Sequence, residues 1–169
     1  MIVCLDVHYG VASTNTALVG VHAWGDGVPA LELTHIDEGA AAAYEPGQFY
    51  ARELPYLLAM LARVTASIDV VVVDGYAWLA PGRPGLGAKL REVRKEPVVG
   101  VAKTRFHGAV AVEVLRGTSA SPLFVTADGI DDDVAAAHVA AMHGPYRMPT
   151  ILTRVDALAR ALASSAKAR

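Results

Sequence analysis

Four consecutive valines, Val70 to Val73, form the most restrictive segment of this sequence, and an aspartate flanks them on each side. A short unbroken run of β-branched residues predicts a strand that is buried on both faces, because one face of an amphipathic helix would not consist of neighbouring residues. The run ends on Asp74, which is followed by Gly75. Open α/β sheets form their binding sites at the carboxyl ends of such strands. Asp74 is therefore a candidate site residue, although an aspartate before a glycine often only caps a turn.

The composition narrows the class of protein. The chain has 169 residues, of which 53% are hydrophobic and 19% charged, and this predicts one globular domain over residues 1–169. The formal net charge of -2 does not indicate a nucleic-acid-binding protein, but an enzyme that holds metal ions is acidic at its centre. Cys4 is the one cysteine, which excludes an internal disulfide and a cysteine zinc cluster and favours a cytoplasmic location. We expect no signal peptide, and no apolar run approaches the ~20 residues that span a membrane.

Hydrophobic periodicity divides the chain into strands and helices. The first three strands are expected at residues 2–9, 11–24 and 30–36, and the hairpin signal at Asp26-Gly27 predicts that they run antiparallel. Proline and glycine between residues 80 and 85 predict a loop. Helices are expected at residues 48–64, 86–94, 134–142 and 149–163. Four more strands are expected at residues 69–74, 97–102, 109–115 and 122–126. Strands with helices between them predict an α/β domain with a mixed sheet.

Four charged residues fall at corresponding ends of these elements: Asp6, Glu53, Asp74 and Lys103. If the strands of Asp6 and Asp74 are neighbours, their carboxylates converge, and Glu53 can lean over them from its helix. Clustered carboxylates repel one another unless a cation lies between them, and Mg²⁺ prefers oxygen ligands. Two such ions can activate a water for phosphodiester hydrolysis, while Lys103 neutralises charge on the phosphate. The alternative for each residue is a solvated charge at the end of a strand or helix.

Several segments resemble the endonuclease V family. The most specific is Gly-Val-Ala-Lys-Thr-Arg at residues 100–105, and shorter matches are Leu5-Asp6-Val7, Arg52-Glu53-Leu54-Pro55 and Asp74-Gly75. The resemblance implies a ribonuclease H-like fold and an endonuclease that cuts DNA or RNA near inosine, as in DNA repair. It also implies a Mg²⁺ or Mn²⁺ cofactor on Asp6, Glu53 and Asp74, with Lys103 as the active-site lysine. These are the residues that the strand and helix ends already indicate.

The sequence departs from the family's pattern at the expected contacts to nucleic acid. The resemblance places a strand-separating wedge at Tyr44 and Pro46, but Glu45 stands where the family has an apolar residue. Gly75 and Tyr76 open the loop that corresponds to the inosine pocket, and Tyr76 can stack on a base or pack on its own core.

A second departure follows the strand at residues 122–126. The family usually has Ser-Pro-Gly-His there, with its histidine at the active site, and this chain has Thr-Ala-Asp-Gly at residues 126–129. We therefore expect Asp128 or Asp131 to supply a replacement oxygen ligand. His8, on the same strand face as Asp6, can contact metal or phosphate, although a hydrogen-bonded neutral histidine is commoner. Two alternatives to an inosine endonuclease stay open: a nucleic-acid-binding relic that has lost cleavage, and a structure-specific nuclease without inosine preference.

Overall fold

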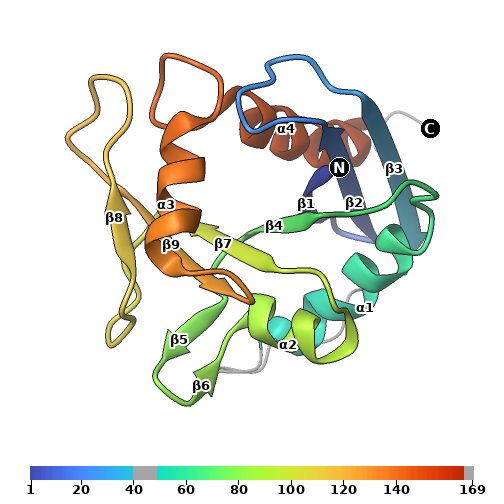
Figure 1. Cartoon of the computed structure of the whole chain (residues 1–169). Coiled ribbons are helices and arrows are strands. Elements are labelled where there is room, and N and C mark those ends of the chain that lie inside the picture. Colours follow the sequence, from blue (N-terminus) through green and yellow to red (C-terminus); the bar gives the residue numbers. More distant parts are fainter. Residues whose placement is uncertain (40–48, 166–169) are drawn as a thin grey trace.

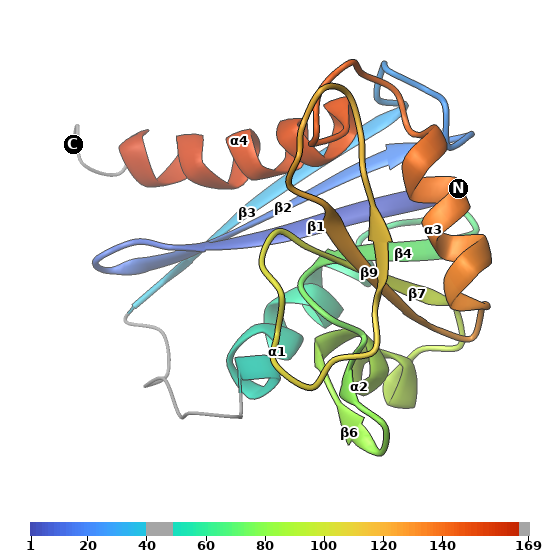
Figure 2. The same cartoon turned by 90° about the vertical axis from the view of Figure 1, so that its left-hand side faces the viewer.

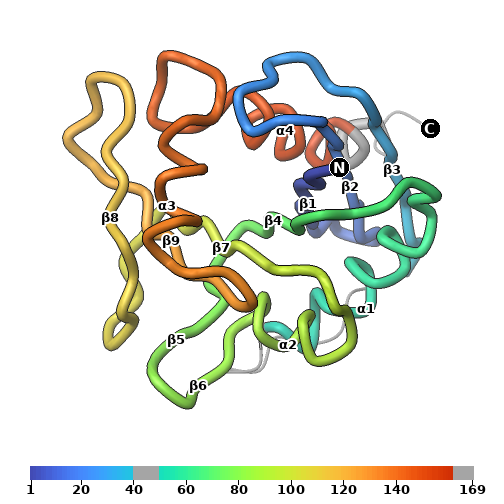
Figure 3. The backbone as a smooth tube through the Cα atoms, in the orientation of Figure 1, coloured from blue at the N-terminus to red at the C-terminus, as the bar shows by residue number. Residues whose placement is uncertain are grey.

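The valine run forms β4 (Val70–Asp74), which lies at the centre of the main sheet in the computed structural model (Figure 1). The structure describes residues 1–39 and 49–165, and within them seven strands form this sheet in the order β3-β2-β1-β4-β7-β9-β8. The other strands are β1 (Ile2–Tyr9), β2 (Ser13–Val21), β3 (Leu31–Glu38), β7 (Val98–Ala102), β8 (Val112–Val114) and β9 (Leu123–Asp128). The backbone trace in Figure 3 shows β1 in the interior of the sheet, between β2 and β4.

The direction of each strand decides which side chains can meet. β1, β2 and β3 are joined as antiparallel neighbours, as the hairpin signal predicts. β1 and β4 are parallel, with Leu5 opposite Val73, and β4 and β7 are parallel, with Asp74 opposite Val101. The carboxyl ends of β1, β4 and β7 therefore meet at one edge. β9 runs antiparallel to β7, so its last residue, Asp128, lies opposite Val98 at the other edge.

Helices cover both faces of the sheet (Figure 2). α1 (Phe49–Leu61) and α2 (Leu86–Val93) lie on one side, where Val71 and Val73 contribute to the core. α3 (Asp132–Ala141) and α4 (Thr150–Ser165) lie on the other, where Val72 contributes to the core. Alternate valines of β4 thus face two cores, which confirms that this strand is buried on both faces.

Some boundaries differ from the sequence-based expectation. α1 ends at Leu61 where the pattern predicted a helix to residue 64, and Pro55 lies inside it in an exposed position. Residues 80–85 do not form a simple loop, because β5 (Trp78–Ala80) and β6 (Arg83–Pro84) pair as a hairpin. Gly82 makes its turn with a φ of 72°, which a side chain would resist. None of the helices formed by residues 49–165 has the length and apolar character to cross a membrane.

Candidate active site

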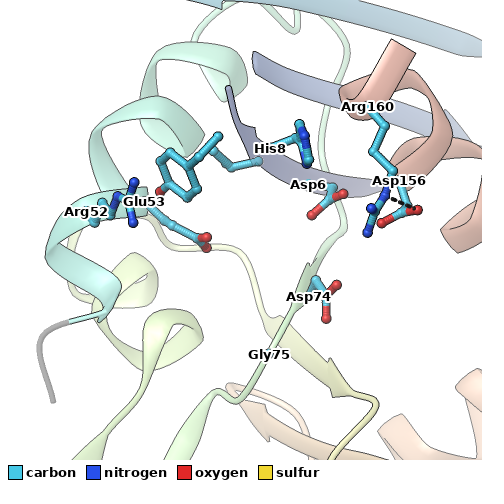
Figure 4. A pocket seen from close by; sticks show the side chains of 10 residues that line it. Asp6, His8, Arg52, Glu53, Asp74, Gly75, Asp156 and Arg160 are labelled. Carbon is cyan, nitrogen blue, oxygen red and sulfur yellow. Dashed lines mark hydrogen bonds and ion pairs between the residues drawn. The ribbon is translucent and has the colours of Figure 1, made fainter. Parts of the chain in front are cut away.

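The carboxyl edge of the sheet brings two predicted acids together. Asp6 lies near the end of β1, and Asp74 ends β4, its parallel neighbour. Gly75 then turns the chain away with a φ of 125°. A cavity of about 370 Å³ opens at this edge (Figure 4). Its lining consists of Asp6, Val7, His8, Tyr9, Arg52, Glu53, Asp74, Gly75, Asp156 and Arg160.

Glu53 reaches the cavity from α1 with only 7% of its surface exposed (Figure 4). Burial and the nearby charges of Asp6 and Asp74 raise the pKa of Glu53 to about 8, against the opposing effect of Arg52. Arg52 itself lies over the ring of Tyr9, with its guanidinium carbon 3.7 Å from the ring centroid. The hydroxyl of Tyr9 is buried and has no hydrogen-bond partner among the residues that the structure describes. The raised pKa means that Glu53 is protonated more readily than an ordinary glutamate.

Asp6 has a similar environment. Burial raises the pKa of Asp6 to about 6, and the charges of Asp74 and Asp156 add to this. Lys103 and the backbone N–H of Val7 act in the opposite direction. Charge on the acids of this cavity is thus only partly compensated.

Lys103 provides part of that compensation from just beyond the end of β7. Its ammonium donates a hydrogen bond to Asp74 Oδ2 over 2.8 Å and lies 4.0 Å from Asp156 Oδ1. Burial alone lowers the pKa of Lys103, but the hydrogen bond to Asp74 and the acidic neighbours outweigh it, so the pKa is raised. Arg147 holds this segment in place, because its guanidinium donates to the carbonyls of Lys103 and Pro122.

Asp156 is an acid of the site that the sequence analysis did not identify. It lies on α4, which packs against β1 and β2, and it completes a group of four acids around the cavity (Figure 4). Arg160, one turn further along α4, donates from Nε to Asp156 Oδ2 over 2.9 Å. The available signal was an acid four residues after Leu152 in the helix expected at residues 149–163, because residues four apart share one face of a helix.

The replacement ligands expected after β9 do not reach the cavity. Asp128 lies at the opposite edge of the sheet, because β9 is antiparallel to β7, and its carboxylate accepts a hydrogen bond from Arg91 over 3.2 Å. Asp131 caps α3 by accepting from the backbone N–H groups of Asp133 and Val134. The expectation that Asp128 or Asp131 lies at the site is therefore corrected, and the fourth carboxylate of the cavity comes from Asp156.

The predicted nucleic-acid contacts have mixed outcomes. Gly75 lines the cavity. Tyr76 is only 8% exposed, and its hydroxyl donates to the Thr104 carbonyl and accepts from the Phe106 N–H. Its ring is thus packed into the protein and is not presented for base stacking in this conformation. Tyr44 and Pro46 lie outside the described residues.

Comparison with known proteins identifies the family. The endonuclease V family model matches residues 1–137. The chain belongs to the endonuclease V family. Endonuclease V of Streptomyces avermitilis is 31% identical over 150 residues, which cover 76% of this chain and 65% of that relative. The Streptomyces coelicolor enzyme is 32% identical over 139 residues, 70% of this chain and 60% of that relative. The chain thus spans somewhat less than two thirds of the length of these relatives.

Solved endonuclease V structures share the fold. The crystal structure of the Streptomyces avermitilis protein superimposes with a TM-score of 0.79 and 29% identity, covering 98% of this chain and 82% of that one. A Ciona intestinalis endonuclease V, solved with a 24mer DNA containing an inosine followed by a ribo-adenosine, superimposes with a TM-score of 0.85 and 16% identity. That match covers 97% of this chain and 85% of the other. The predicted ribonuclease H-like mixed sheet is therefore confirmed.

The donor set of the cavity suits a hard divalent cation. Asp6, Glu53, Asp74 and Asp156 offer only carboxylate oxygens, the ligands that Mg²⁺ and Mn²⁺ prefer. The raised pKa values of Asp6 and Glu53 show that a further positive charge would stabilise their ionised forms. Within residues 1–39 and 49–165, no three potential ligands are gathered closely enough to hold one ion as they stand. The Lys103 ammonium, which forms an ion pair with Asp74 and lies near Asp156, is a cation already present among these acids.

Proposed function

We propose that this chain is a metal-dependent endonuclease that hydrolyses phosphodiester bonds in nucleic acid. The observation that carries the proposal is the convergence of four acids and Lys103 at one sheet edge, in a chain of the endonuclease V family. A Mg²⁺ or Mn²⁺ ion would be held by Asp6, Asp74 and Asp156 together with Glu53. When bound, it would lower the pKa of a coordinated water and neutralise charge on the phosphate.

The side chains of the cavity divide the remaining work. Lys103 already lies against Asp74, and its flexible ammonium can move from that carboxylate to a phosphate oxygen. There it stabilises the negative charge that develops as the phosphorus–oxygen bond breaks. Burial and the neighbouring acids raise the pKa of Glu53 to about 8 without a cation, and a bound ion would favour its ionised form, in which both carboxylate oxygens can serve as ligands.

The proposed substrate is a strand that contains a deaminated base, inosine. Membership of the endonuclease V family supports this, as does the relative that was solved with inosine-containing DNA. One observation favours a second candidate, a nuclease that shares the metal chemistry without preferring inosine. The residue after Gly75 is a buried tyrosine whose ring and hydroxyl are both engaged within the protein.

A cleavage assay on end-labelled oligonucleotides separates these functions. Single-stranded and double-stranded substrates, each with and without one inosine, are incubated with Mg²⁺ or Mn²⁺. If the chain is an inosine endonuclease, we expect a nick near inosine that disappears in Asp74→Ala and persists in Asp128→Ala. Cutting that ignores inosine supports the second candidate. The absence of cleavage on every strand, with either ion, would contradict the proposal and indicate a binding relic.

A further inference from the structure

Arg160 is a cavity residue to which the proposed chemistry gives no role. Its side chain extends from α4 to Asp156, and it lines the same cavity as Asp6 and Asp74 (Figure 4). The negative charges of Asp6 and Asp74 also act on its guanidinium. It is 60% exposed, so it lies at the solvent side of the acidic group.

Only part of the guanidinium is engaged. Nε donates to Asp156 Oδ2 over 2.9 Å, whereas no other hydrogen bond of Arg160 is formed within residues 1–39 and 49–165. The two terminal nitrogens therefore keep their donors free beside the cavity. An arginine uses such paired donors to bind two oxygens of one phosphate, which a lysine cannot do with the same geometry.

Asp156 is shared between two cationic side chains. Arg160 contacts one of its oxygens, and Lys103 lies 4.0 Å from the other. A divalent cation that takes Asp156 as a ligand competes with both for the same carboxylate. A single ion pair at an exposed arginine contributes little to stability. Breaking the pair between Arg160 and Asp156 when the cation binds therefore costs little free energy.

We propose that Arg160 binds a backbone phosphate of the nucleic-acid strand, on the α4 side of the cavity, once a divalent cation has taken Asp156. This inference rests on the proposed function and adds a second cationic contact to the substrate. Lys103 contacts the phosphate at which the strand is cleaved, and Arg160 binds another phosphate of the same strand. Arg160 therefore contributes to substrate affinity and not to the bond-breaking step.

The same helix provides a matched control. Arg154 is 49% exposed and donates from Nε and Nη2 to Glu32, over 2.7 and 2.9 Å. It is absent from the cavity lining, and both of its engaged donors point to β3. Arg154→Gln and Arg160→Gln therefore remove the same charge from the same helix, but only one of them removes it from the cavity.

The test measures binding of a fluorescent, inosine-containing single-stranded oligonucleotide to the whole chain at several salt concentrations. Ca²⁺ replaces Mg²⁺ so that binding is observed without cleavage. For Arg160→Gln we expect affinity about tenfold weaker, and a plot of log affinity against log salt less steep by about one phosphate contact. Arg160→Lys should keep part of the affinity because the charge remains, and Arg154→Gln should match the wild type in both affinity and slope. A parallel Mn²⁺ titration without nucleic acid should show that Arg160→Gln binds the ion at least as tightly as the wild type.

The outcomes separate this inference from the proposed function. Wild-type protein that binds the oligonucleotide, together with an Arg160→Gln variant that behaves like Arg154→Gln, overturns the role of Arg160 and leaves the nuclease proposal standing. Wild-type protein that binds no oligonucleotide with any ion overturns both. Equal losses in Arg160→Gln and Arg154→Gln would mean that only the overall charge matters, which also overturns the inference.

Discussion

Asp74 illustrates how one residue position combines a structural and a chemical requirement. It is the last residue of a buried strand, yet its own side chain is 42% exposed and faces Lys103. We expect Asp74→Asn to lower the cleavage rate by about a thousandfold, because an amide replaces a charged oxygen ligand. The free energy of unfolding should change by less than about 1 kcal/mol, since exposed ion pairs contribute little.

Asp128→Asn is the matched control for this prediction. It removes a carboxylate from the end of another strand of the same sheet, but at the opposite edge and against Arg91. Single-turnover cleavage and urea unfolding of both variants test the comparison. Equal loss of activity in the two variants would show that the location of the acid is unimportant, contrary to the proposed site.

Lys103 leads to a second prediction at the residue scale, because it has opposite effects on substrate and metal. Lys103→Gln should lower kcat by about a hundredfold, since the ammonium no longer helps the ion to stabilise charge on the phosphate. The same variant should bind Mn²⁺ more tightly in the absence of nucleic acid, because the ammonium no longer competes for Asp74 and Asp156.

Isothermal titration with Mn²⁺ and single-turnover cleavage measure the two effects of Lys103→Gln separately. Lys89→Gln is the control, because Lys89 lies on α2 and pairs with Glu92 away from the cavity. Weaker Mn²⁺ binding by Lys103→Gln would contradict the view that this lysine occupies part of the cation's place.

Among the elements, β7 must come very close to the segment that follows β4. Gly100 of β7 lies opposite Val73, and a Cβ at position 100 would lie 2.5 Å from Ala77 N and 2.6 Å from Gly75 O. These are backbone atoms, so no change of side-chain rotamer can relieve the contact. Gly100→Ala should therefore displace Gly75 from the cavity edge, and it should cost about 1–3 kcal/mol of stability through overpacking.

Gly25→Ala is the control for this close approach, because, chain neighbours aside, no atom of residues 1–39 and 49–165 lies within 4 Å of a Cβ there. Urea unfolding measures the cost, and cleavage measures the displacement of the site. Gly100→Ala with unchanged stability and unchanged activity would show that β7 can shift away without consequence for Gly75.

The elements also show where the sequence was informative. Local patterns predicted the buried β4 and the antiparallel β1, β2 and β3, because periodicity and turn signals act over a few residues. The convergence of Asp6 and Asp74 was expected only if their strands are neighbours, and the parallel pairing of β1 with β4 meets that condition. Local patterns could not give the direction of β9 relative to β7, which depends on pairing between distant segments. Asp128 was expected at the site because it follows the strand where the resemblance places the family's histidine, and the antiparallel direction of β9 puts it at the other edge.

The packing position of α4 is the second feature that the sequence did not predict. Its amphipathic pattern predicted a helix with an inward face, but not which strands the face would cover. Because α4 lies across β1 and β2, Asp156 arrives at the edge where β1 ends. The sequence likewise left open whether Tyr76 stacks on a base or packs inward, because its contacts with Thr104 and Phe106 form only in the fold.

For the molecule as a whole, the acidic cavity makes stability depend on pH when no divalent cation is bound. The pKa of Glu53 is raised from 4.5 to about 8, and that of Asp6 from 3.8 to about 6. Between the ordinary and the raised values, the folded chain binds more protons than the unfolded chain. Stability falls with rising pH wherever the folded state binds more protons. The metal-free protein should therefore lose stability progressively from about pH 4 to about pH 8, by at most ~1.4 kcal/mol per pH unit for each proton involved.

Thermal unfolding in chelator, followed across this pH range, tests the whole-molecule effect. Glu53→Gln cannot ionise, so its metal-free melting temperature should fall less between pH 6 and pH 8 than that of the wild type. Mn²⁺ should reverse the trend in the wild type, because ligands must lose their protons before they bind and the stabilisation by the ion therefore grows with pH. Glu92→Gln, which removes an exposed acid of α2 outside the cavity, should keep the wild-type dependence. A wild-type melting temperature that stays constant or rises from pH 6 to pH 8 in chelator would contradict the burial of an uncompensated carboxyl group at this site.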